Sequence, residues 1–600
     1  MTFDTSPRDA LVLLFLSMFP FLVYFGSIMN TAYNNNALLL LAVFLVAALA
    51  FLVCLRDGLI PEKFYPFVIA TISFCLIFQV LWISPYLVGY VDTHDEYFLF
   101  QLVKSTGRWN PSLPDFYDST LSVTILPAMV QSLLAVGDTA LFKTMYPLTF
   151  TFVPVVLFLA YRNIVDSKRA FLSSILFMSY TAYFSEVSFI GKQETAELIV
   201  AALLLLTYGG RNIKRSGRSI MMMILLVGLV FAHYSSLYLY LGIVFLSFPL
   251  LAALKKKSVI SSTFMAIFLV FALCWYVLTA RGTAVTEVVQ IGQLMFSSFF
   301  SDFFQPATRG GVVLMFFGIG ITQALVNWIN LMVQYSIQLF IILGVLTLWK
   351  RRKSVNGQFL SYASISLFLV VSGIVVPYFS SSLNESRIYQ FALIFLAPAC
   401  VLGGEAVFRS LSYATATLRQ RSWHVSLPNS NRSLTFASCV IILFLLFNTG
   451  FINEISGAPP NSFALGMNRI RGSSNPRLVA YSYAVYLPEQ DYASARWLSN
   501  YMVLNQHVCA DSISTFGVLL AYAAIAPQAP YTPELRPPST GYSCEYTYYY
   551  AYLSYANTVK GIVDDSYPYA LYPISEFSNL DYGRNRIYSN NGTVILASEQ

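Results

Sequence analysis

Four ionisable side chains fall within five residues of the segment VDTHDEYF, residues 91–98. They are Asp92, His94, Asp95 and Glu96. Carboxyl groups this close repel one another, so at least one pKa should rise unless a cation or hydrogen bonds intervene. A protonated carboxyl beside an ionised one is what a general base or a divalent metal site requires. The segment therefore predicts either a site for such chemistry or a solvated acidic loop.

A second polar cluster, residues 183–198, contains Glu186, Lys192 and Gln193 between two apolar stretches. Lys192 is the only basic residue of this cluster. A single lysine at a bilayer surface suits the phosphate of an anionic lipid. A lysine can also reach the lipid headgroups with no specific role. Both interpretations of Lys192 stay open from the sequence.

Two single residues, His233 and Arg387, complete the candidate set. Arg387 lies in SSSLNESRIYQ, residues 380–390, where it can bind a phosphate through two N–H groups, extend to the lipid headgroups or pair with Glu385. His233 begins HYSSLYLY, and a lone histidine is more often structural than functional. Acids that can activate a hydroxyl and cations that can bind a phosphate thus occur in four separate segments.

The elements that must position these residues are membrane-spanning helices. Charged residues make up 11% of the chain and hydrophobic residues 56%, whereas a soluble domain has about 25% charged residues. A spanning helix needs about 20 mainly apolar residues. The stretches that fit are near 11–30, 37–55, 66–88, 142–160, 170–187, 195–209, 219–234, 237–254, 259–279, 328–349, 357–378, 388–408 and 434–452, which predicts about 13 spans.

Basic residues orient these spans, because Lys and Arg are enriched in cytoplasmic loops. With the N-terminus in the cytoplasm, the cytoplasmic segments of residues 1–452 carry 21 of the 28 basic residues. This places all four polar clusters on the outer side. It also requires that 121–136 and 311–325 lie on the outer surface without crossing. The basic loops reflect membrane insertion, so no nucleic-acid partner is expected.

The predicted domains are therefore a transmembrane domain, 1–452, with outer loops 89–141 and 280–327, and an extracytoplasmic domain, 453–600. The tail contains no spanning stretch. A helix is predicted for 491–502 and a strand for 592–596, so the tail reads as mixed α/β. Cys509 and Cys544 lie in it, where they can either pair or stay reduced.

An outer loop that opens with acids, followed by surface helices, many spans and a C-terminal outer domain, resembles the GT-C glycosyltransferases. A closer resemblance is to an archaeal family of polytopic membrane proteins related to that superfamily. The segments that carry it are spread over most of the chain: DTHDEYF (92–98), LSVTILPAM (121–129), GKQETAEL (191–198), HYSSLYL (233–239), SRIYQFALIFLAPACVLG (386–403), DYASARWLS (491–499) and NRIYSNNGTVIL (585–596). The sequence has Lys192 where the family pattern has arginine.

This resemblance implies a mainly α-helical, GT-C-like membrane protein that moves a sugar from a polyprenyl (dolichyl) phosphate to a glycan, protein or lipid acceptor, with inversion. Asp92, Asp95 and Glu96 would be catalytic, and Asp92 and Asp95 could bind a divalent metal, Mg²⁺ or Mn²⁺. Lys192, Arg387 and His233 would bind the donor phosphate. Glu186, His94 and Gln193 would support the acceptor or the metal.

Two other functions remain possible from the sequence. A flippase or transporter of lipid-linked sugars would place its ionisable groups near mid-bilayer, in broken helices of repeated halves. No internal repeat is visible, and the acids lie at loop edges. A membrane scaffold that only displays the tail would leave the acids of 92–96 pointing in different directions.

Overall fold

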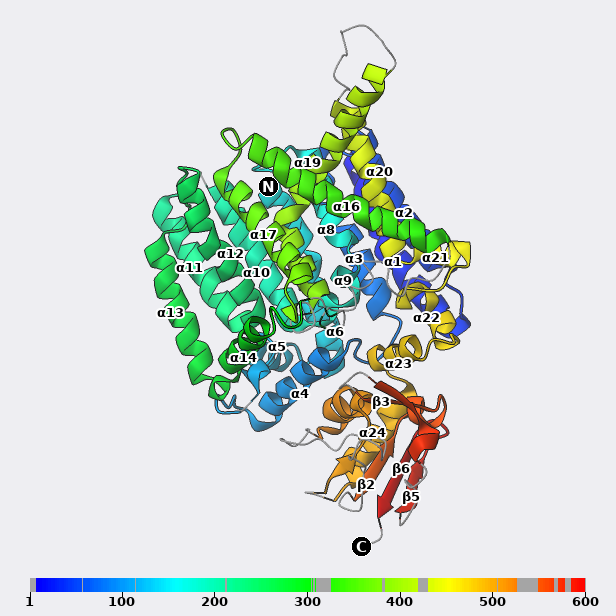
Figure 1. Cartoon of the computed structure of the whole chain (residues 1–600). Helices are drawn as coiled ribbons and strands as arrows, with labels where there is room; N and C mark the ends of the chain where they lie inside the picture. The colour runs from blue at the N-terminus through cyan, green and yellow to red at the C-terminus, as the bar shows by residue number, and fades with distance from the viewer. Residues whose placement is uncertain are drawn as a thin grey trace.

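The architecture is that of a bundle of apolar helices with a smaller, strand-containing part at one end (Figure 1). The computed structural model describes residues 7–56, 58–113, 115–210, 213–303, 305, 308, 325–379, 384–418, 430–503, 506–525, 549–565, 570–577 and 584–598. The mainly α-helical class and the strand-containing C-terminal part, both predicted from the sequence, are confirmed.

The first half of the chain alternates long apolar helices with short ones. Its elements are α1 (Pro7–Tyr33), α2 (Ala37–Leu55), η1 (Glu62–Phe64), α3 (Tyr65–Leu81), α4 (Val91–Thr106), η2 (Phe116–Ser119), α5 (Ile125–Leu134), α6 (Asp138–Thr151), α7 (Val153–Tyr161), α8 (Ser167–Ser179), α9 (Thr181–Ser185), η3 (Val187–Phe189), α10 (Gly191–Gly209), α11 (Arg215–Ala232), α12 (Tyr234–Ala253), α13 (Ser262–Leu278), η5 (Ala280–Gly282) and α14 (Thr283–Ser297).

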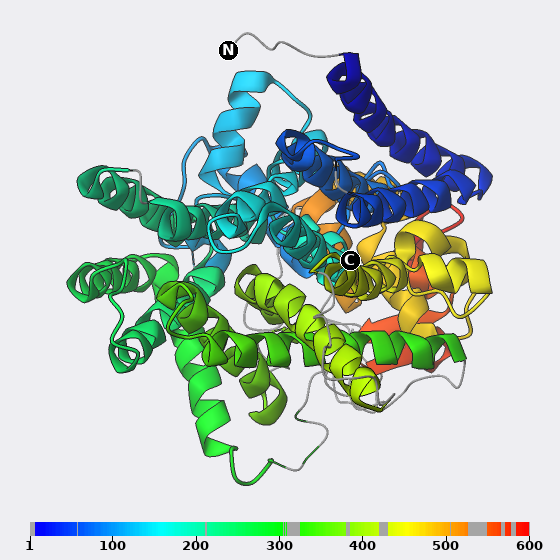
Figure 2. The same cartoon turned by 90° about the horizontal axis from the view of Figure 1, so that it is seen from above.

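The second half completes the bundle and then leaves it. Its helices are α16 (Leu325–Lys350), α17 (Gly357–Val375), α19 (Glu385–Leu418), α20 (Ser430–Asn448), α21 (Phe451–Ser456), α22 (Phe463–Arg471), α23 (Pro476–Val485) and α24 (Glu489–Tyr501). Seen from above, α1 and α2 lie at one side of the bundle and α11 to α13 at the other (Figure 2).

The C-terminal part combines two small sheets with short helices. Its remaining elements are β1 (Val508–Cys509), the π-helix η7 (Ser514–Ala523), β2 (Tyr550–Leu553), α25 (Tyr555–Thr558), β3 (Ile562–Asp565), β4 (Ala570–Pro573), η9 (Ile574–Phe577), β5 (Arg584–Ser589) and β6 (Val594–Ser598). The four-stranded sheet has the order β1-β2-β6-β5, and β3 pairs with β4. The predicted helix at 491–502 and strand at 592–596 correspond to α24 and β6. Cys509 is disulfide-bonded, so the alternative of a reduced thiol fails for it; Cys544 lies outside the described residues.

The number of spans differs from the sequence-based prediction. In the described part of the chain, 10 helices are long and apolar enough to cross a membrane, or 11 if α13 and the helix bent by 92° against it form one span. The count of 13 is not confirmed. Two predicted spans, 170–187 and 195–209, account for most of the difference. Helix α8 has only 13 residues and is too short, and α10 carries the charged residues Lys192, Glu194 and Glu197.

The stretch 121–136 forms a short helix, as its non-crossing assignment requires. Helix α5 has 10 residues, about 15 Å, which is half of the roughly 30 Å of a bilayer core. Met129, Leu133 and Leu134 on it are exposed, so it presents an apolar face. The other stretch, 311–325, lies outside the described residues except for its last residue.

Helices α16 and α19 pack very closely, and α19 carries Arg387 near its N-terminal end. A Cβ on Gly344 of α16 would lie 1.8 Å from the carbonyl oxygen of Ala399, and a Cβ on Gly403 of α19 would lie 1.8 Å from that of Phe340. Small residues let membrane helices approach in this way. The two glycines thus fix the position of the helix that carries Arg387.

The C-terminal part contacts the segment that leads into α4. Gly89 N–H donates to the Val485 carbonyl at 3.2 Å, and Leu87 N–H donates to the Tyr522 hydroxyl at 2.9 Å. Helix α4 also packs on η7. The acidic segment of α4 therefore lies between the helix bundle and the C-terminal part (Figure 1).

Candidate functional site: an ion cluster at the start of α4

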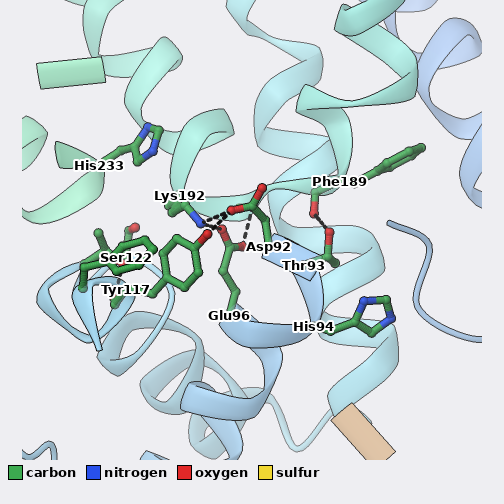
Figure 3. Close-up of polar contacts among 12 residues, drawn as sticks. Asp92, Thr93, His94, Glu96, Tyr117, Ser122, Phe189, Lys192 and His233 are labelled. Carbon is green, nitrogen blue, oxygen red and sulfur yellow. Dashed lines mark hydrogen bonds and ion pairs between the residues drawn. The ribbon is translucent and has the colours of Figure 1, made fainter. Parts of the chain in front are cut away.

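The acidic segment is the first turn and a half of helix α4, not a loop. Residues three and four apart lie on one face of a helix. Asp92, Asp95 and Glu96 therefore share a face, whereas His94 lies on another. Figure 3 shows Asp92 and Glu96 pointing towards Lys192 and His94 pointing away from them. The helix thus separates the three acids from the histidine predicted to assist them.

Lys192, from α10, lies between two carboxylates of α4. Its Nζ is 3.1 Å from Asp92 Oδ1 and 3.1 Å from Glu96 Oε1. The Lys192 side chain is only 1% exposed, so the interpretation that it extends to the lipid headgroups is wrong. An ammonium this deeply buried needs paired anions to offset its desolvation, and the two carboxylates supply them.

Arg387, near the start of α19, binds the other oxygen of the same aspartate. Its Nη2 is 2.6 Å from Asp92 Oδ2. Two cations from separate helices therefore converge on one carboxylate. Among the described residues, the buried Nε of Arg387 has no hydrogen-bond partner. One donor of this guanidinium is thus still available.

Tyr117 is a member of the cluster that the sequence did not indicate. Its hydroxyl donates to Asp92 Oδ1, and Lys192 Nζ lies 3.4 Å from the centroid of its ring. Tyr117 belongs to η2, whose backbone N–H at Tyr117 donates to the Asp115 side chain at 2.8 Å. A cation over an aromatic face is attracted by the ring, so Tyr117 contacts both partners of the Lys192–Asp92 pair.

Glu96 is the most firmly held acid. Besides Lys192, it accepts a hydrogen bond of 2.8 Å from Gly191 N–H at the first residue of α10, where the helix dipole favours a negative charge. A Cβ on Gly191 would lie 2.9 Å from the Tyr146 ring. Glycine at 191 therefore lets the start of α10 pack directly on Tyr146 while its N–H binds Glu96.

The pKa values of the three acids of α4 shift in different directions, because their surroundings differ. Burial would raise the pKa of Asp92, but Arg387, Lys192 and the Tyr117 hydroxyl outweigh it and hold that pKa far below the usual range. Burial, then the charge of Asp115, raises the pKa of Asp95 to about 8. Burial also raises the pKa of Glu96, against the opposing charge of Lys192. At neutral pH, Asp92 is thus the ionised carboxylate and Asp95 is mostly protonated.

The other predicted site residues lie around this cluster with partners of their own. His233 Nδ1 is 2.8 Å from Ser236 Oγ; burial, then the charge of Lys192, lowers the pKa of His233. Glu186 accepts from the Ser386 hydroxyl, next to Arg387. Gln193 donates to Glu197 at 3.0 Å, and His94 Nδ1 lies 3.0 Å from the Tyr90 carbonyl. Gln193 and His94 therefore face away from Asp92.

The arrangement does not fit a divalent metal at Asp92 and Asp95. Both oxygens of Asp92 face cations, which a metal would have to displace. Within the described ranges, no group of three or more His, Cys, Asp and Glu residues is placed to hold a metal ion. Dependence on Mg²⁺ or Mn²⁺ stays a prediction that chelation can test.

A variant of Tyr117 can test whether its hydroxyl holds Asp92 in place. Tyr117→Phe keeps the ring under Lys192 but removes the hydrogen bond to Asp92. A hydrogen bond to a charged group contributes roughly 1.5–3 kcal/mol to stability, so we expect Tyr117→Phe to lower the melting temperature and Tyr117→Ala, which also removes the ring under Lys192, to lower it further. Thermal unfolding of both variants in detergent measures this; equal melting temperatures for wild type and Tyr117→Phe would show that the hydroxyl does not hold Asp92.

Comparison with known proteins gives one family and several solved structures. The family model described as "Predicted membrane protein (DUF2206)" matches residues 218–596. No curated protein matches the chain. The match covers Arg387 and the C-terminal part but not α4 or Lys192.

The chain is similar in structure to three membrane proteins of low sequence identity. The archaeal oligosaccharyltransferase AglB from Archaeoglobus fulgidus, in complex with an inhibitory peptide and a dolichol-phosphate, has 14% identity, covers 90% of this chain and 74% of its own, and has a TM-score of 0.49. ArnT from Cupriavidus metallidurans, bound to undecaprenyl phosphate, has 12% identity; the match covers 89% of this chain and 97% of ArnT, with a TM-score of 0.44. The arabinofuranosyltransferase AftD from Mycobacteria has 12% identity; the match covers 91% of this chain and 40% of AftD, with a TM-score of 0.45.

Proposed function

The chain belongs to the DUF2206 family of predicted membrane proteins, and we propose that it is a glycosyltransferase that uses a polyprenyl-phosphate sugar. The observation that carries this proposal is the convergence of Lys192 and Arg387, from two helices, on Asp92 of a third. A carboxylate can orient and deprotonate an acceptor, and two cations can bind a phosphate and stabilise it as it leaves. These are the two requirements of sugar transfer from a lipid phosphate.

The proposed reaction is a single displacement at the anomeric carbon of the donor. A hydroxyl or amide of the acceptor attacks this carbon from the side opposite the phosphate, so the configuration inverts. The bond between the carbon and the phosphate oxygen breaks, and its electron pair stays on the polyprenyl phosphate. The acceptor's proton passes to Asp92. Lys192 and Arg387 bind the phosphate as its negative charge increases.

The proposed topology places this chemistry at the outer face of the cell membrane, with the N-terminus in the cytoplasm. Two of the basic segments assigned to the cytoplasm meet in space: Lys256 Nζ donates to the Arg352 carbonyl at 2.6 Å. They lie at the end of the bundle opposite α4 (Figure 1). The cluster at α4 and the C-terminal part would then both be extracytoplasmic.

Asp95 gives the proposal a pH dependence. Its pKa of about 8 means that it is mostly neutral below pH 8 and ionised above. Ionisation adds a negative charge close to Lys192, where the anionic donor would bind. We therefore expect KM for the donor to rise as pH increases through 8, and Asp95→Asn to abolish this rise because asparagine stays neutral. Donor KM measured from pH 6.5 to 9.5 in both proteins tests this, and identical profiles would remove Asp95 from the donor site.

The proposal as a whole is tested by sugar transfer in lipid. Purified protein in liposomes is given radiolabelled polyprenyl-phosphate sugars with membrane extracts as acceptors, with and without a chelator. Transfer of label would support the enzyme, and its response to the chelator would decide on the metal. Label that crosses the bilayer without being transferred would contradict it and favour a flippase.

A further inference from the structure

We propose that Asp92 occupies the phosphate site of the empty enzyme, and that the donor's phosphate displaces it from Lys192 and Arg387. The freed carboxylate then faces the acceptor. This inference rests on the proposed function and adds an order of events to it: donor binding converts a carboxylate bound between two cations into an available base.

The two acids of the cluster differ in how firmly they are held. Glu96 is fully buried, and besides Lys192 it is bound by the backbone N–H of Gly191. Asp92 is 17% exposed, and its partners are the side chains of Tyr117, Lys192 and Arg387. Side chains can change rotamer, whereas the N–H at the start of α10 cannot move independently. Glu96 is therefore the permanent counter-ion of Lys192, and Asp92 is the exchangeable one.

The cations can accept a phosphate once Asp92 moves. Lys192 would keep Glu96 and turn one N–H from Asp92 to a phosphate oxygen. Arg387 would offer the Nη2 that now holds Asp92 together with its Nε, which has no partner among the described residues. Two adjacent N–H groups of a guanidinium match two oxygens of a phosphate. The guanidinium thus has the donors for a paired contact, of which Asp92 uses one.

The charges at the site favour replacement of Asp92 by the donor phosphate over binding of both to the two cations at once. Lys192 and Arg387 carry two positive charges, and Asp92 and Glu96 can carry two negative ones. A phosphodiester brings a third negative charge, and like charges at one site repel strongly in a buried environment. If the phosphate takes the cations, Asp92 loses the partners that lower its pKa. Its pKa then returns towards the usual range, and it becomes a better proton acceptor for the acceptor group.

The decisive variant is Asp92→Asn, which keeps the shape of the side chain but cannot compete with a phosphate. Undecaprenyl phosphate is titrated into wild type and Asp92→Asn in nanodiscs of neutral lipid, and binding is measured by the shift in melting temperature and by tryptophan fluorescence. We expect Asp92→Asn to bind this lipid at least tenfold more tightly than wild type, although it is defective in transfer.

The matched control is Asp138→Asn, which removes a carboxylate that pairs with Lys104 and has no ion pair to Lys192 or Arg387 among the described residues. Its affinity should rise less than threefold. If wild type and Asp92→Asn bound undecaprenyl phosphate with equal affinity, or if both variants gained affinity equally, Asp92 would not be displaced by the phosphate. Either result would leave the proposed glycosyltransferase function standing. Failure of both wild type and Asp92→Asn to bind undecaprenyl phosphate would instead contradict the proposed function.

Discussion

Asp92→Asn is expected to lower kcat for sugar transfer by roughly 10³-fold, within the range that a positioned proton acceptor contributes. Asparagine is close in shape to aspartate, so the neighbours of the side chain need not move. It cannot take a proton at neutral pH, and it cannot balance Lys192 and Arg387. Transfer assays under saturating donor separate this loss of kcat from any change in donor binding.

The control for Asp92→Asn is Asp138→Asn, which removes an acid at the first residue of α6. Asp138 pairs with Lys104 in the last turn of α4 at 2.6 Å, at the other end of that helix from Asp92. Its loss should change transfer less than twofold, because exposed ion pairs contribute about 0–1 kcal/mol. Full activity of Asp92→Asn, with a normal control, would show that another group accepts the proton.

Lys192→Ala is expected to have the second large effect, on both stability and activity. Removal of one partner from a buried ion pair costs about 3–5 kcal/mol, because a charge is left without compensation. Glu96 is fully buried beside Lys192 and would be that charge. The variant should unfold at markedly lower temperature in detergent, and it should show no measurable transfer because the donor phosphate loses a cation.

A double variant separates the two effects. In Lys192→Ala with Glu96→Gln, no buried charge is left unpaired, and the glutamine can still accept from Gly191 N–H. Most of the lost melting temperature should return while transfer stays absent. Return of transfer together with stability would mean that Lys192 has only a structural role.

The sequence predicted the members of the site better than their arrangement. Asp92, Lys192 and Arg387 were singled out because ionisable groups are scarce near apolar stretches and costly there. Their direct contacts could not be predicted, because they lie on α4, α10 and α19, and only the packing of three helices brings them together. Two alternatives considered from the sequence are wrong: Lys192 does not extend to the lipid headgroups, and residues 91–98 are not a solvated loop. The sequence could not decide between the alternatives, because the burial of these side chains results from the packing of the whole fold.

Tyr117 shows why the sequence could not reveal the whole site. It lies in a stretch rich in aromatic residues, WNPSLPDFYD at 109–118, where no spacing distinguishes it from Phe116. Its role depends on the turn capped by Asp115 and on the position of Lys192 above its ring. Both are long-range results of folding.

The class of a mainly α-helical protein with many apolar spans was confirmed, whereas the predicted number of 13 spans was not. Apolar length identified the helices, because a bilayer core requires about 20 apolar residues. The apolar stretch 170–187 is interrupted at Tyr180 and forms α8, α9 and η3, so no single helix there has the length of a span. The first two turns of α10 carry Lys192, Glu194 and Glu197. Hydropathy identifies apolar stretches, but it does not show where a helix breaks or which charged residues are buried by packing.

The most direct test of the central claim is a single turnover with donor bound before the acceptor is added. Wild type and Asp92→Asn in liposomes are loaded with a radiolabelled polyprenyl-phosphate sugar, and the glycosylated acceptor and the released polyprenyl phosphate are both measured. We expect equal amounts of the two products in wild type and neither product in Asp92→Asn, although the variant holds donor. Transfer at the wild-type rate by Asp92→Asn, or no release of polyprenyl phosphate by wild type, would contradict it.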